Sequence, residues 1–569
     1  MKPGTFKACM IAGLLSLLGG WPAVPTRVVA GEPAKDYLNA APEDLAAWRQ
    51  LKFGMFIHWG PVSLKGVEIG WGRGGERRGR KDTKPGSVPV EVYDNLYKQF
   101  NPTKFDACQW VEIAQAAGMR YMVFTTKHHD GFCEFDSQLT DYKITSPQSP
   151  YGKDIVKQLS DACHAGGLPW GIYYSPPDWH HPDYRTENHA RYIQYLHGQL
   201  RELLSNYGRV DMIFFDGLGG KAEDWDGQNL IKLCRQLQPH VIINNRCGLP
   251  ADYDTPEQRI GKMQTDRPWE TCMTLCRQWA WKPDDEMKSL QTCLQTLVNV
   301  AGGDGNLLFN VGPMPDGRIE PRQVERLKEM GQWLTRYGES IYGTRGGPFS
   351  RGRWGATTYQ GNTIYVHILD ADQDTITLPP IQKNIVASSV LTGGKANLKQ
   401  TDQSIEIAVP KADRQEIDTI VVLKLDGPAA EAKPGRLPTM SVAVGKKATA
   451  SNVFGNNHQR LGADKAFDDD PNTRWATDAG THQAWLQVDL GQPMTIARAA
   501  IEEAYAGRVQ VFELQAKQGD AWKTIARGKQ IGSDLLLKFP PVRAQIFRLN
   551  ILMAKEGPTI TEFQLFEAK

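Results

Sequence analysis

Hydrophobic segments that end abruptly on polar residues constrain the fold of this chain more than any other feature. One of them, Met212–Phe215, is followed at once by Asp216 and a glycine. Four consecutive large apolar residues with aromatics predict a strand buried on both faces, as in parallel sheets. A carboxylate at the carboxyl end of such a strand lies where α/β barrels carry their chemistry. A turn-forming Asp-Gly after any strand would explain the same residues, so the choice between a functional carboxylate and an ordinary turn depends on whether the pattern recurs.

The pattern does recur. Further apolar runs begin near residues 53, 119, 168, 240 and 306, and they end on polar or ionisable residues. Between them lie helical patterns at 106–117, 153–165, 188–206, 227–237, 284–300 and 320–337. Strand and helix thus alternate over about 300 residues, which predicts parallel βαβ units and a (β/α)8-like barrel of the α/β class. Six or seven strands are recognisable, so an irregular barrel is also consistent with the pattern.

The alternation ends near residue 345. From 352 to about 425, short apolar runs alternate with glycine and polar turns, which predicts a small β-sandwich. A stretch rich in Pro, Ala, Glu and Lys predicts a linker, and another β-rich unit follows it. We therefore predict a signal peptide at 1–30, the barrel at 31–345, a β-sandwich at 346–427, a linker at 428–440 and a second β-sandwich at 441–569.

The amino terminus has the pattern of an export signal. Lys2 and Lys7 precede an apolar stretch that is too short to span a membrane comfortably, and small residues follow it. Cleavage after Ala30 fits the small-residue rule better than cleavage after Ala23. No other long apolar run exists, so we expect a secreted or periplasmic protein without a membrane span.

Charge and cysteine content narrow the class of partner. The 569 residues carry a formal charge of +2 and no polybasic run long enough to predict nucleic-acid binding. A cluster of cations at 73–81 lies in a glycine-rich loop, which predicts a solvated rim of the active site. The eight cysteines after the signal lack the spacing of a disulfide framework or a zinc site, so most are expected to be buried small hydrophobes. The amino-acid sequence does not determine the oligomeric state.

The strand-end residues would converge on one pocket in a barrel. Histidines with a carboxylate there could bind a metal. Metal-binding barrels usually place two histidines as His-x-His, whereas His128 and His129 are adjacent and would point to opposite faces of a strand. The alternative is recognition of a polyol around a nucleophilic Asp216. Seven tryptophans in these regions favour a sugar, because the apolar faces of sugars stack on aromatic rings.

Several motifs, in order, are similar to those of family 29 glycoside hydrolases, the α-L-fucosidases. They are 52–60 (KFGMFIHWG), 125–132 (TTKHHDGF), 171–175 (GIYYS), 214–217 (FFDG), 269–270 (WE) and 307–313 (LLFNVGP). The resemblance covers about residues 45 to 345 and implies a retaining mechanism with Asp216 as nucleophile. It implies fucose contacts at His58, Glu68, Trp71, His128, His129, Tyr173 and Arg246. Here Ile69-Gly70 separates Glu68 from Trp71, where the family has a Glu-Trp pair.

A retaining glycosidase needs a second carboxyl group about 5–5.5 Å from the nucleophile, to protonate the leaving oxygen. That group must hold its proton near neutral pH. The candidates are Glu257 and Glu270. Glu257 lies 11 residues after Arg246, a spacing that resembles several family members, and a proline-bearing loop suits a residue that must reach the leaving group. Glu270 could instead be a buried structural carboxylate, so we expect Glu257 to be the acid/base and keep Glu270 as the alternative.

The carboxyl-terminal part resembles discoidin-like modules of the coagulation factor type C kind. The residues that carry the resemblance are 463–475 (ADKAFDDDPNTRW), 485–491 (WLQVDLG) and 560–563 (ITEF). Clustered oxygens at Asp468, Asp470, Thr473 and Glu562 suit a structural Ca²⁺. Trp475 and Trp485 are expected to lie in the core of this module, and such a module often only packs on its enzyme.

We therefore predict an exported retaining exo-α-L-fucosidase that removes terminal fucose from glycans and needs no cofactor for the chemistry. One alternative is a non-catalytic glycan-binding protein built on an inactive barrel. Another is a related glycosidase acting on α-L-galactosides, because an apolar pocket rejects an added hydroxyl only modestly. The linkage and the aglycone preference are left open.

Overall fold

A computed structural model of the chain describes residues 37–80, 84–261, 263–352, 354–372, 375–435, 437, 440–470, 473–532 and 535–568. The predicted signal peptide and Lys81 lie outside these ranges. The chain folds into two compact units, which divide after residue 435. Among the described helices, none is both long and apolar enough to cross a membrane.

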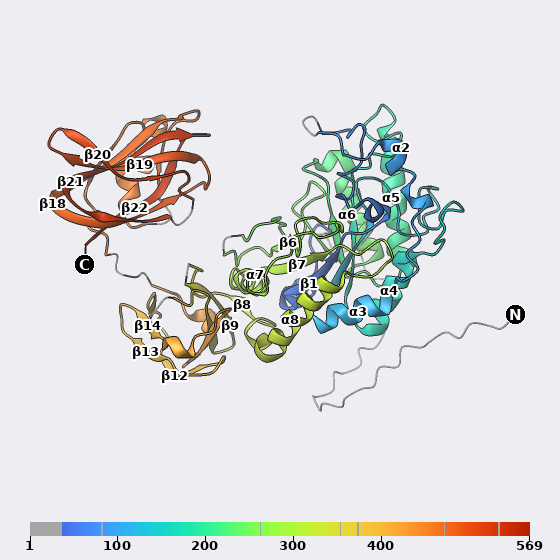
Figure 1. Ribbon diagram of the computed structural model, residues 1–569, viewed down its shortest axis with the longest axis horizontal. Coiled ribbons are helices and arrows are strands. Elements are labelled where there is room, and N and C mark those ends of the chain that lie inside the picture. The colour runs from blue at the N-terminus through green and yellow to red at the C-terminus, as the bar shows by residue number, and fades with distance from the viewer. Residues whose placement is uncertain are drawn as a thin grey trace. The chain divides into compact units, whose positions relative to one another are not determined.

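A parallel sheet of seven strands forms the centre of the first unit (Figure 1), with the strand order β5-β4-β3-β2-β1-β7-β6. All residues of its strands are buried except one position in β6, as expected for a sheet covered on both faces. This confirms the predicted α/β architecture. The strands are β1 (Phe53–Ile57), β2 (Met122–Lys127), β3 (Trp170–Tyr174), β4 (Met212–Phe215), β5 (Ile242–Ile243), β6 (Glu270–Thr274) and β7 (Asn306–Val311).

Helices connect the strands, and three of them begin at a side-chain cap. Asp106 and Asp154 accept hydrogen bonds from the backbone N–H groups three residues ahead, at the starts of α3 and α4. Ser289 does the same for α7, which explains why this helix begins six residues later than its apolar pattern predicts. The helices of this unit are α1 (Pro42–Leu51), α2 (Val90–Tyr93), α3 (Ala107–Ala116), α4 (Ile155–Gly166), α5 (His189–Asn206), α6 (Gly227–Leu237), α7 (Leu290–Gly302) and α8 (Pro321–Tyr337).

The eighth position of the barrel is occupied by an irregular segment, 253–257, which lies between β5 and β6. It forms isolated parallel bridges to Asn244 on one side and to Trp269 and Cys272 on the other. Backbone hydrogen bonds reinforce both sides, among them one of 3.0 Å from Asp254 N to the Pro268 carbonyl and one of 3.1 Å from Asn245 N to the Tyr253 carbonyl. Pro256 cannot donate to a ladder, so the segment does not become a regular strand. The barrel is therefore closed but irregular.

A second sheet system follows within the same unit. Five strands in the order β12-β15-β10-β9-β8 face three in the order β11-β14-β13. Val366 and Leu423, both fully buried, belong to the apolar core between them. The strands are β8 (Arg345–Gly346), β9 (Gly355–Gln360), β10 (Thr363–Ile368), β11 (Thr375–Leu378), β12 (Ile385–Val390), β13 (Asn397–Gln400), β14 (Ile405–Ala408) and β15 (Thr419–Leu425).

The second unit is an antiparallel β-structure with its own core, consistent with the predicted discoidin-like sandwich. Trp475 is fully buried in that core, as predicted. Trp485 is only half-buried and stacks on the guanidinium of Arg548, so its predicted core position is wrong. The elements are β16 (Lys447–Ala450), α9 (His458–Leu461), β17 (Trp475–Ala476), β18 (Ala484–Glu503), β19 (Val509–Gln518), β20 (Ala521–Gly528), β21 (Leu535–Ala554) and β22 (Thr559–Glu567).

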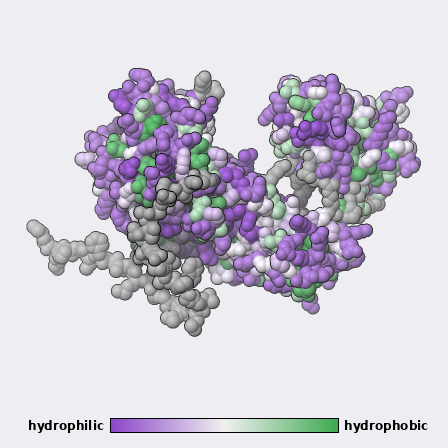
Figure 2. Space-filling model, turned by 180° about the vertical axis from the view of Figure 1, so that it is seen from behind, coloured by the Kyte–Doolittle hydropathy of each residue, from purple (hydrophilic) through white to green (hydrophobic). Residues whose placement is uncertain are grey.

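The surface of each unit is mainly hydrophilic on the face that Figure 2 shows, with hydrophobic residues in small separate patches. The eight described cysteines are free thiols; seven are buried and Cys108 is half-buried. They therefore act as the small buried hydrophobes that their irregular spacing predicts.

Candidate active site

A cavity of about 420 Å³ opens at the carboxyl ends of the barrel strands. We call it the strand-end pocket. It is lined by Phe56, His58, Trp71, His128, Tyr173, Phe214, Asp216, Leu218, Gly219, Gly220, Asn245, Arg246, Gly248, Thr255, Glu257, Cys272 and Trp279. The buried strands set these positions, because a parallel barrel brings all its strand ends to one rim.

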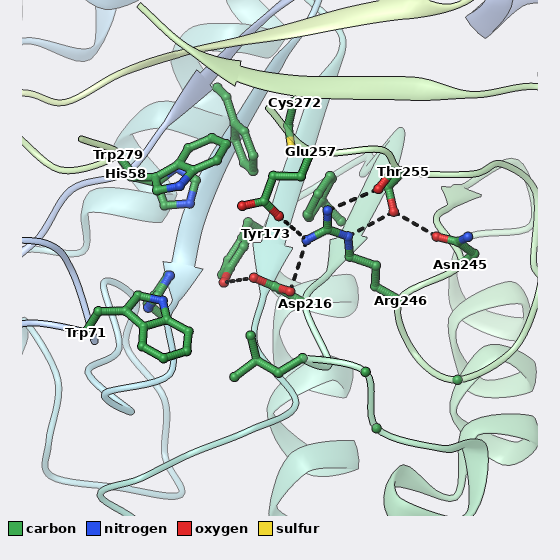
Figure 3. Close-up of a pocket in the computed structure, with 17 residues that line it drawn as sticks. His58, Trp71, Tyr173, Asp216, Asn245, Arg246, Thr255, Glu257, Cys272 and Trp279 are labelled. Carbon is green, nitrogen blue, oxygen red and sulfur yellow. Dashed lines mark hydrogen bonds and ion pairs between the residues drawn. The ribbon is translucent and has the colours of Figure 1, made fainter. Parts of the chain in front are cut away.

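Asp216 follows β4 and lies among hydrogen-bond donors (Figure 3). The Tyr173 hydroxyl donates to its Oδ2 over 3.0 Å, and Arg246 Nη1 donates to its Oδ1 over 3.2 Å. Burial, and then the Asp216 charge, raise the pKa of Tyr173 well above 10, so the hydroxyl stays protonated and can donate. The carboxylate is thus held with a cation on one oxygen and a neutral donor on the other.

Arg246 also forms an ion pair with Glu257. The same Nη1 that contacts Asp216 lies 2.8 Å from Glu257 Oε2. Two oxygens bound to one nitrogen cannot be farther apart than about 6 Å, given the two measured distances. Thr255 fixes the guanidinium, since its hydroxyl and its carbonyl accept from Arg246 Nε and Nη2 over 2.9 and 3.1 Å. The Glu257 side chain is 42% exposed and so remains free to move.

Glu270, the alternative acid, lies elsewhere. It begins β6, is buried, and does not line the strand-end pocket. Its carboxyl group accepts a hydrogen bond from the Tyr121 hydroxyl and interacts with that of Tyr253. Burial raises the pKa of Glu270 to about 8. A proton held at neutral pH is what an acid needs, but this one is kept in the barrel core.

His58 is neutral, and its proton position is determined by its neighbours. Burial lowers the pKa of His58 to about 4. The Asn310 amide nitrogen donates to the Trp279 carbonyl over 2.7 Å, so the amide oxygen faces His58 Nδ1 at 2.7 Å. That oxygen can only accept, and Nδ1 must therefore carry the proton. The lone pair of Nε2 is then left to accept a hydrogen bond.

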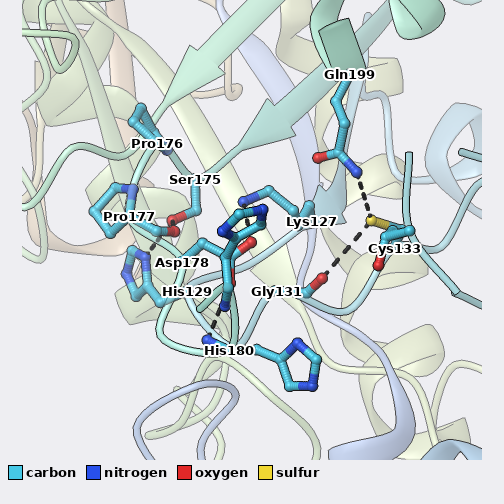
Figure 4. Close-up of polar contacts among 12 residues, drawn as sticks. Lys127, His129, Gly131, Cys133, Ser175, Pro176, Pro177, Asp178, His180 and Gln199 are labelled. Atoms are coloured by element: carbon cyan, nitrogen blue, oxygen red, sulfur yellow. Dashed lines mark hydrogen bonds and ion pairs between the residues drawn. The ribbon is translucent and has the colours of Figure 1, made fainter. Parts of the chain in front are cut away.

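His129 is oriented by a second chain of contacts (Figure 4). The Ser175 hydroxyl donates to the Pro177 carbonyl over 2.6 Å, so His129 Nδ1, also 2.6 Å away, must donate to Ser175. His129 Nε2 lies 3.5 Å from Asp216 Oδ2. His129 is not among the residues that line the pocket, and its Nε2, which carries no proton in this neutral form, makes no hydrogen bond to a described residue. Sequence reasoning missed Ser175 and Asn310, because these contacts join residues 46 and 252 positions apart.

The sequence predicted that the adjacent residues His128 and His129 point to opposite faces of a strand, and this prediction is wrong. His128 and His129 follow β2 in a loop, and their ring centroids are 4.1 Å apart. Burial lowers the pKa of both well below 6.5. Within the described part of the chain, no group of three or more His, Cys, Asp or Glu side chains is arranged to hold a metal ion.

Glu68 and Trp71 come from the glycine-rich loop. Trp71 lines the pocket, whereas Glu68 does not. Both oxygens of the Glu68 carboxylate accept backbone hydrogen bonds, from Trp279 N over 3.0 Å and from Ala280 N over 2.9 Å. Glu68 therefore holds Trp279 in the pocket wall. Four apolar or weakly polar side chains form that wall: Phe56, Phe214, Cys272 and Trp279.

The predicted cation site in the second unit brings acidic groups together. Thr473 Oγ1 donates to the Asp468 carboxylate over 2.8 Å, and the Asp470 N–H donates to it over 3.1 Å. Burial, followed by the charges of Asp468 and Asp469, raises the pKa of Glu562 to about 8. No described Lys, Arg or His side chain pairs with Glu562. Glu562 is thus a buried carboxyl group near other carboxylates, although these side chains are not among the described groups that are arranged to hold a metal ion.

Two family descriptions match the chain. "Alpha-L-fucosidase" matches residues 30–339, more than half of the chain, and "F5/8 type C domain" matches residues 447–563. Tissue alpha-L-fucosidase of Macaca fascicularis is 29% identical over 361 residues, which cover 58% of this chain and 76% of that one.

Solved structures agree in fold. Alpha-L-fucosidase isoenzyme 1 from Paenibacillus thiaminolyticus has a TM-score of 0.60 and 34% identity, over 68% of this chain and 99% of that one. An alpha-L-fucosidase from Bacteroides thetaiotaomicron, trapped as a covalent intermediate with 2-fluoro-fucosyl fluoride, has a TM-score of 0.61 and 26% identity, over 70% and 100%.

Proposed function

The chain belongs to the α-L-fucosidase family of retaining glycoside hydrolases, and from this premise we propose that Asp216 and Glu257 carry its chemistry. The observation that supports this assignment is the shared contact with Arg246 Nη1. Before substrate binds, this contact keeps the two carboxyl oxygens within about 6 Å, close to the separation of about 5–5.5 Å used by retaining enzymes and below the 6.5–9.5 Å used by inverting ones.

In the first step, an oxygen of Asp216 attacks the anomeric carbon and the bond to the leaving oxygen breaks. Glu257 gives its proton to that oxygen, so the leaving group departs as an alcohol. Tyr173 and Arg246 hold Asp216 by hydrogen bonds and keep it oriented until it attacks. In the second step, Glu257 removes a proton from water, the water oxygen attacks the anomeric carbon and the bond to Asp216 breaks, which releases fucose with its original configuration.

Glu257 must turn away from Arg246 before it can act as an acid, because an acid has to contact the oxygen that it protonates. Its exposure and its place on the irregular segment 253–257 support such a movement. Substrate binding in the pocket would displace the side chain toward the leaving oxygen. Arg246 then remains as the partner of Asp216 alone.

The pocket suits a terminal 6-deoxy sugar. Phe56, Phe214, Cys272 and Trp279 offer a surface for a methyl group and an apolar sugar face. His58 Nε2 accepts a hydrogen bond from a sugar hydroxyl. We therefore propose terminal α-L-fucosyl residues of glycans as the substrate, with weak activity on α-L-galactosides, since the added hydroxyl is rejected only modestly.

Export and calcium are further proposals. The amino-terminal pattern of Lys2, Lys7 and an apolar stretch supports secretion or transport to the periplasm. The acidic group formed by Asp468, Asp470, Thr473 and Glu562 supports a structural Ca²⁺ in the second unit. The hydrolysis itself needs no metal, because the two carboxyl groups supply both nucleophile and proton.

The roles of the carboxyl groups are tested by substitution. Asp216→Asn should reduce turnover by several orders of magnitude while leaving the protein folded. Glu257→Ala should impair hydrolysis of natural glycans far more than that of an activated aryl fucoside. Azide, which needs no base, should restore turnover of Glu257→Ala on the aryl fucoside and give an α-fucosyl azide, because its attack on the covalent intermediate inverts the anomeric carbon a second time.

The matched control is Glu270→Gln, which should hydrolyse both substrates without azide. Near-normal turnover by Asp216→Asn would remove this residue from the nucleophile role. Azide rescue of Glu270→Ala, with none for Glu257→Ala, would reverse the assignment of the acid/base.

A further inference from the structure

A second cavity, of about 360 Å³, adjoins the strand-end pocket. The two share Leu218, Gly219 and Gly220 in their walls. Gly219 has a φ of 77°, and a Cβ built on it would meet no atom within 4 Å. The wall that the two cavities share therefore carries no side chain at Gly219 and leaves open space there, so a substrate could extend from one cavity into the other.

Cationic side chains dominate this cavity. Arg78, Arg80, Arg185 and Lys221 line it, and Asp224 is the one carboxylate among its lining residues. We call it the basic cavity. Asp224 is committed to Arg185 by an ion pair of 2.7 Å. One carboxylate thus offsets one of four cations, and the cavity keeps an excess of positive charge.

The remaining arginines are held in place by carbonyl groups, which do not neutralise them. Arg78 donates to the carbonyls of Pro182 over 2.8 Å and His181 over 2.5 Å. Arg80 donates to the carbonyl of Leu218, in the shared wall, over 3.4 Å. These contacts position fixed positive charge at the cavity. An oriented guanidinium fork suits the oxygens of a sulfate or carboxylate group.

Aromatic rings and Arg77 connect the two cavities. Trp179 and Tyr184 line the basic cavity, and Trp71 lines the strand-end pocket. The guanidinium carbon of Arg77 lies 5.0 Å from the Trp71 ring and 5.4 Å from the Trp179 ring. A further cation therefore lies between the cavities, and the aromatic walls could carry the face of another sugar.

We propose that the basic cavity binds an anionic group, a sulfate ester or a carboxylate, carried by the substrate beyond the fucosyl residue that is removed. The inference builds on the proposed function and adds the class of glycan that the site prefers. It also assigns a role to Arg78 and Arg80 of the cation cluster at 73–81, which the sequence indicated only as a solvated rim. Neutral fucosides remain substrates, but they do not use the basic cavity.

The test compares kcat/KM for three fucosyl oligosaccharides that share one linkage. One is neutral, one carries a sulfate ester on the aglycone and one carries a carboxylate there. At low ionic strength, at least one charged substrate should exceed the neutral one about tenfold. The advantage should shrink at high salt, because screening weakens the attraction between exposed charges. The better of the two charged substrates identifies the anionic group.

Variants then locate the effect. Lys221→Glu and Arg80→Gln should each lower the ratio of charged to neutral kcat/KM several-fold. Lys232→Glu, the same change on α6 outside the basic cavity, should leave that ratio as it is. Equal kcat/KM for all three substrates, or a charge preference that survives Lys221→Glu and Arg80→Gln, would overturn the inference. Hydrolysis of none of the three substrates would instead contradict the proposed function.

Discussion

Two backbone carbonyls determine which nitrogen carries the proton on His58 and on His129. The Trp279 carbonyl orients Asn310, and Asn310 then accepts from His58 Nδ1. The Pro177 carbonyl orients Ser175 in the same way for His129. A neutral histidine has one donor and one acceptor nitrogen, so fixing one fixes the other. In the proposed complex, His58 would therefore meet the sugar as an acceptor, which suits a ligand rich in hydroxyl donors.

Asn310→Asp should make recognition at His58 sensitive to pH. The new carboxylate still accepts from Nδ1, but its charge favours the protonated ring and raises the pKa of His58 above its present value of about 4. Protonated Nε2 donates instead of accepting. The acid limb of the kcat/KM profile should therefore move upward by about one pH unit or more, mainly through KM.

The control is Asn299→Asp on α7, which adds the same charge away from the pocket. A pH profile of Asn310→Asp that coincides with those of the parent and of Asn299→Asp would contradict the role given to Asn310.

Glu270→Gln should stabilise the protein at neutral and alkaline pH. The unfolded chain ionises Glu270 near pH 4.5, whereas the native chain keeps it protonated up to about pH 8. The native state binds more protons in that window, so its stability falls as pH rises and the full cost is reached above pH 8. Glutamine cannot ionise. Its gain should be absent near pH 4.5 and reach on the order of a few kcal/mol at pH 8 to 9 in urea unfolding. A gain that does not depend on pH would contradict this account.

At the scale of elements, regular periodicity made most of the first unit predictable. Helices α3, α4, α5, α6 and α8 begin and end within two residues of their apolar patterns. β6 was missed, because five residues with polar ends give no hydrophobic run. The eighth barrel position was missed as well, since segment 253–257 is held by isolated bridges that leave no sequence pattern. The strand-end residues of the site were visible in sequence, whereas the contacts that orient them depend on the closed barrel.

Asp254→Ala should loosen the segment that carries Glu257. The Asp254 carboxylate accepts from Arg267 Nε over 2.8 Å, from Gln264 Nε2 over 3.1 Å and from Asn245 Nδ2 over 3.2 Å. Without these contacts, Glu257 should be positioned less well. Turnover of a fucoside with a poor leaving group should fall about tenfold or more, since general acid catalysis contributes about 10²–10⁴ to such steps. An activated aryl fucoside should be affected much less.

Comparison of the two substrates separates positioning from general damage. Asp316→Ala removes a half-buried carboxylate that pairs with Arg318 away from the pocket, and it should leave the ratio between the substrates unchanged. Equal losses on both substrates in Asp254→Ala would mean that the segment supports the fold and not the placement of Glu257.

At the scale of the whole molecule, the chemistry and the proposed cation site belong to different units. The barrel core and the core of the second unit share no residues. A unit with its own apolar core can unfold as a separate cooperative transition. A perturbation confined to the second unit should then change its melting temperature and leave hydrolysis of a small fucoside intact.

Chelation of Ca²⁺ provides that perturbation. Ligand loss lowers the stability of the unit that binds the ligand, by an amount set by its affinity and concentration. For Ca²⁺ at 100 times its dissociation constant, the loss is about 2.7 kcal/mol, enough to lower a melting temperature by several degrees. Calorimetry of the full chain should therefore show one transition that moves down on chelation and returns with added Ca²⁺.

Glu562→Gln should abolish this response, because the buried carboxylate is the proposed ligand without a cationic partner. Glu556→Gln, an exposed glutamate of the same unit, should retain it. Turnover of an aryl fucoside should be unchanged by chelator in all three proteins. A chelator that lowers kcat reversibly would return the barrel histidines to the metal interpretation, and one that moves no transition would remove Ca²⁺ from the second unit.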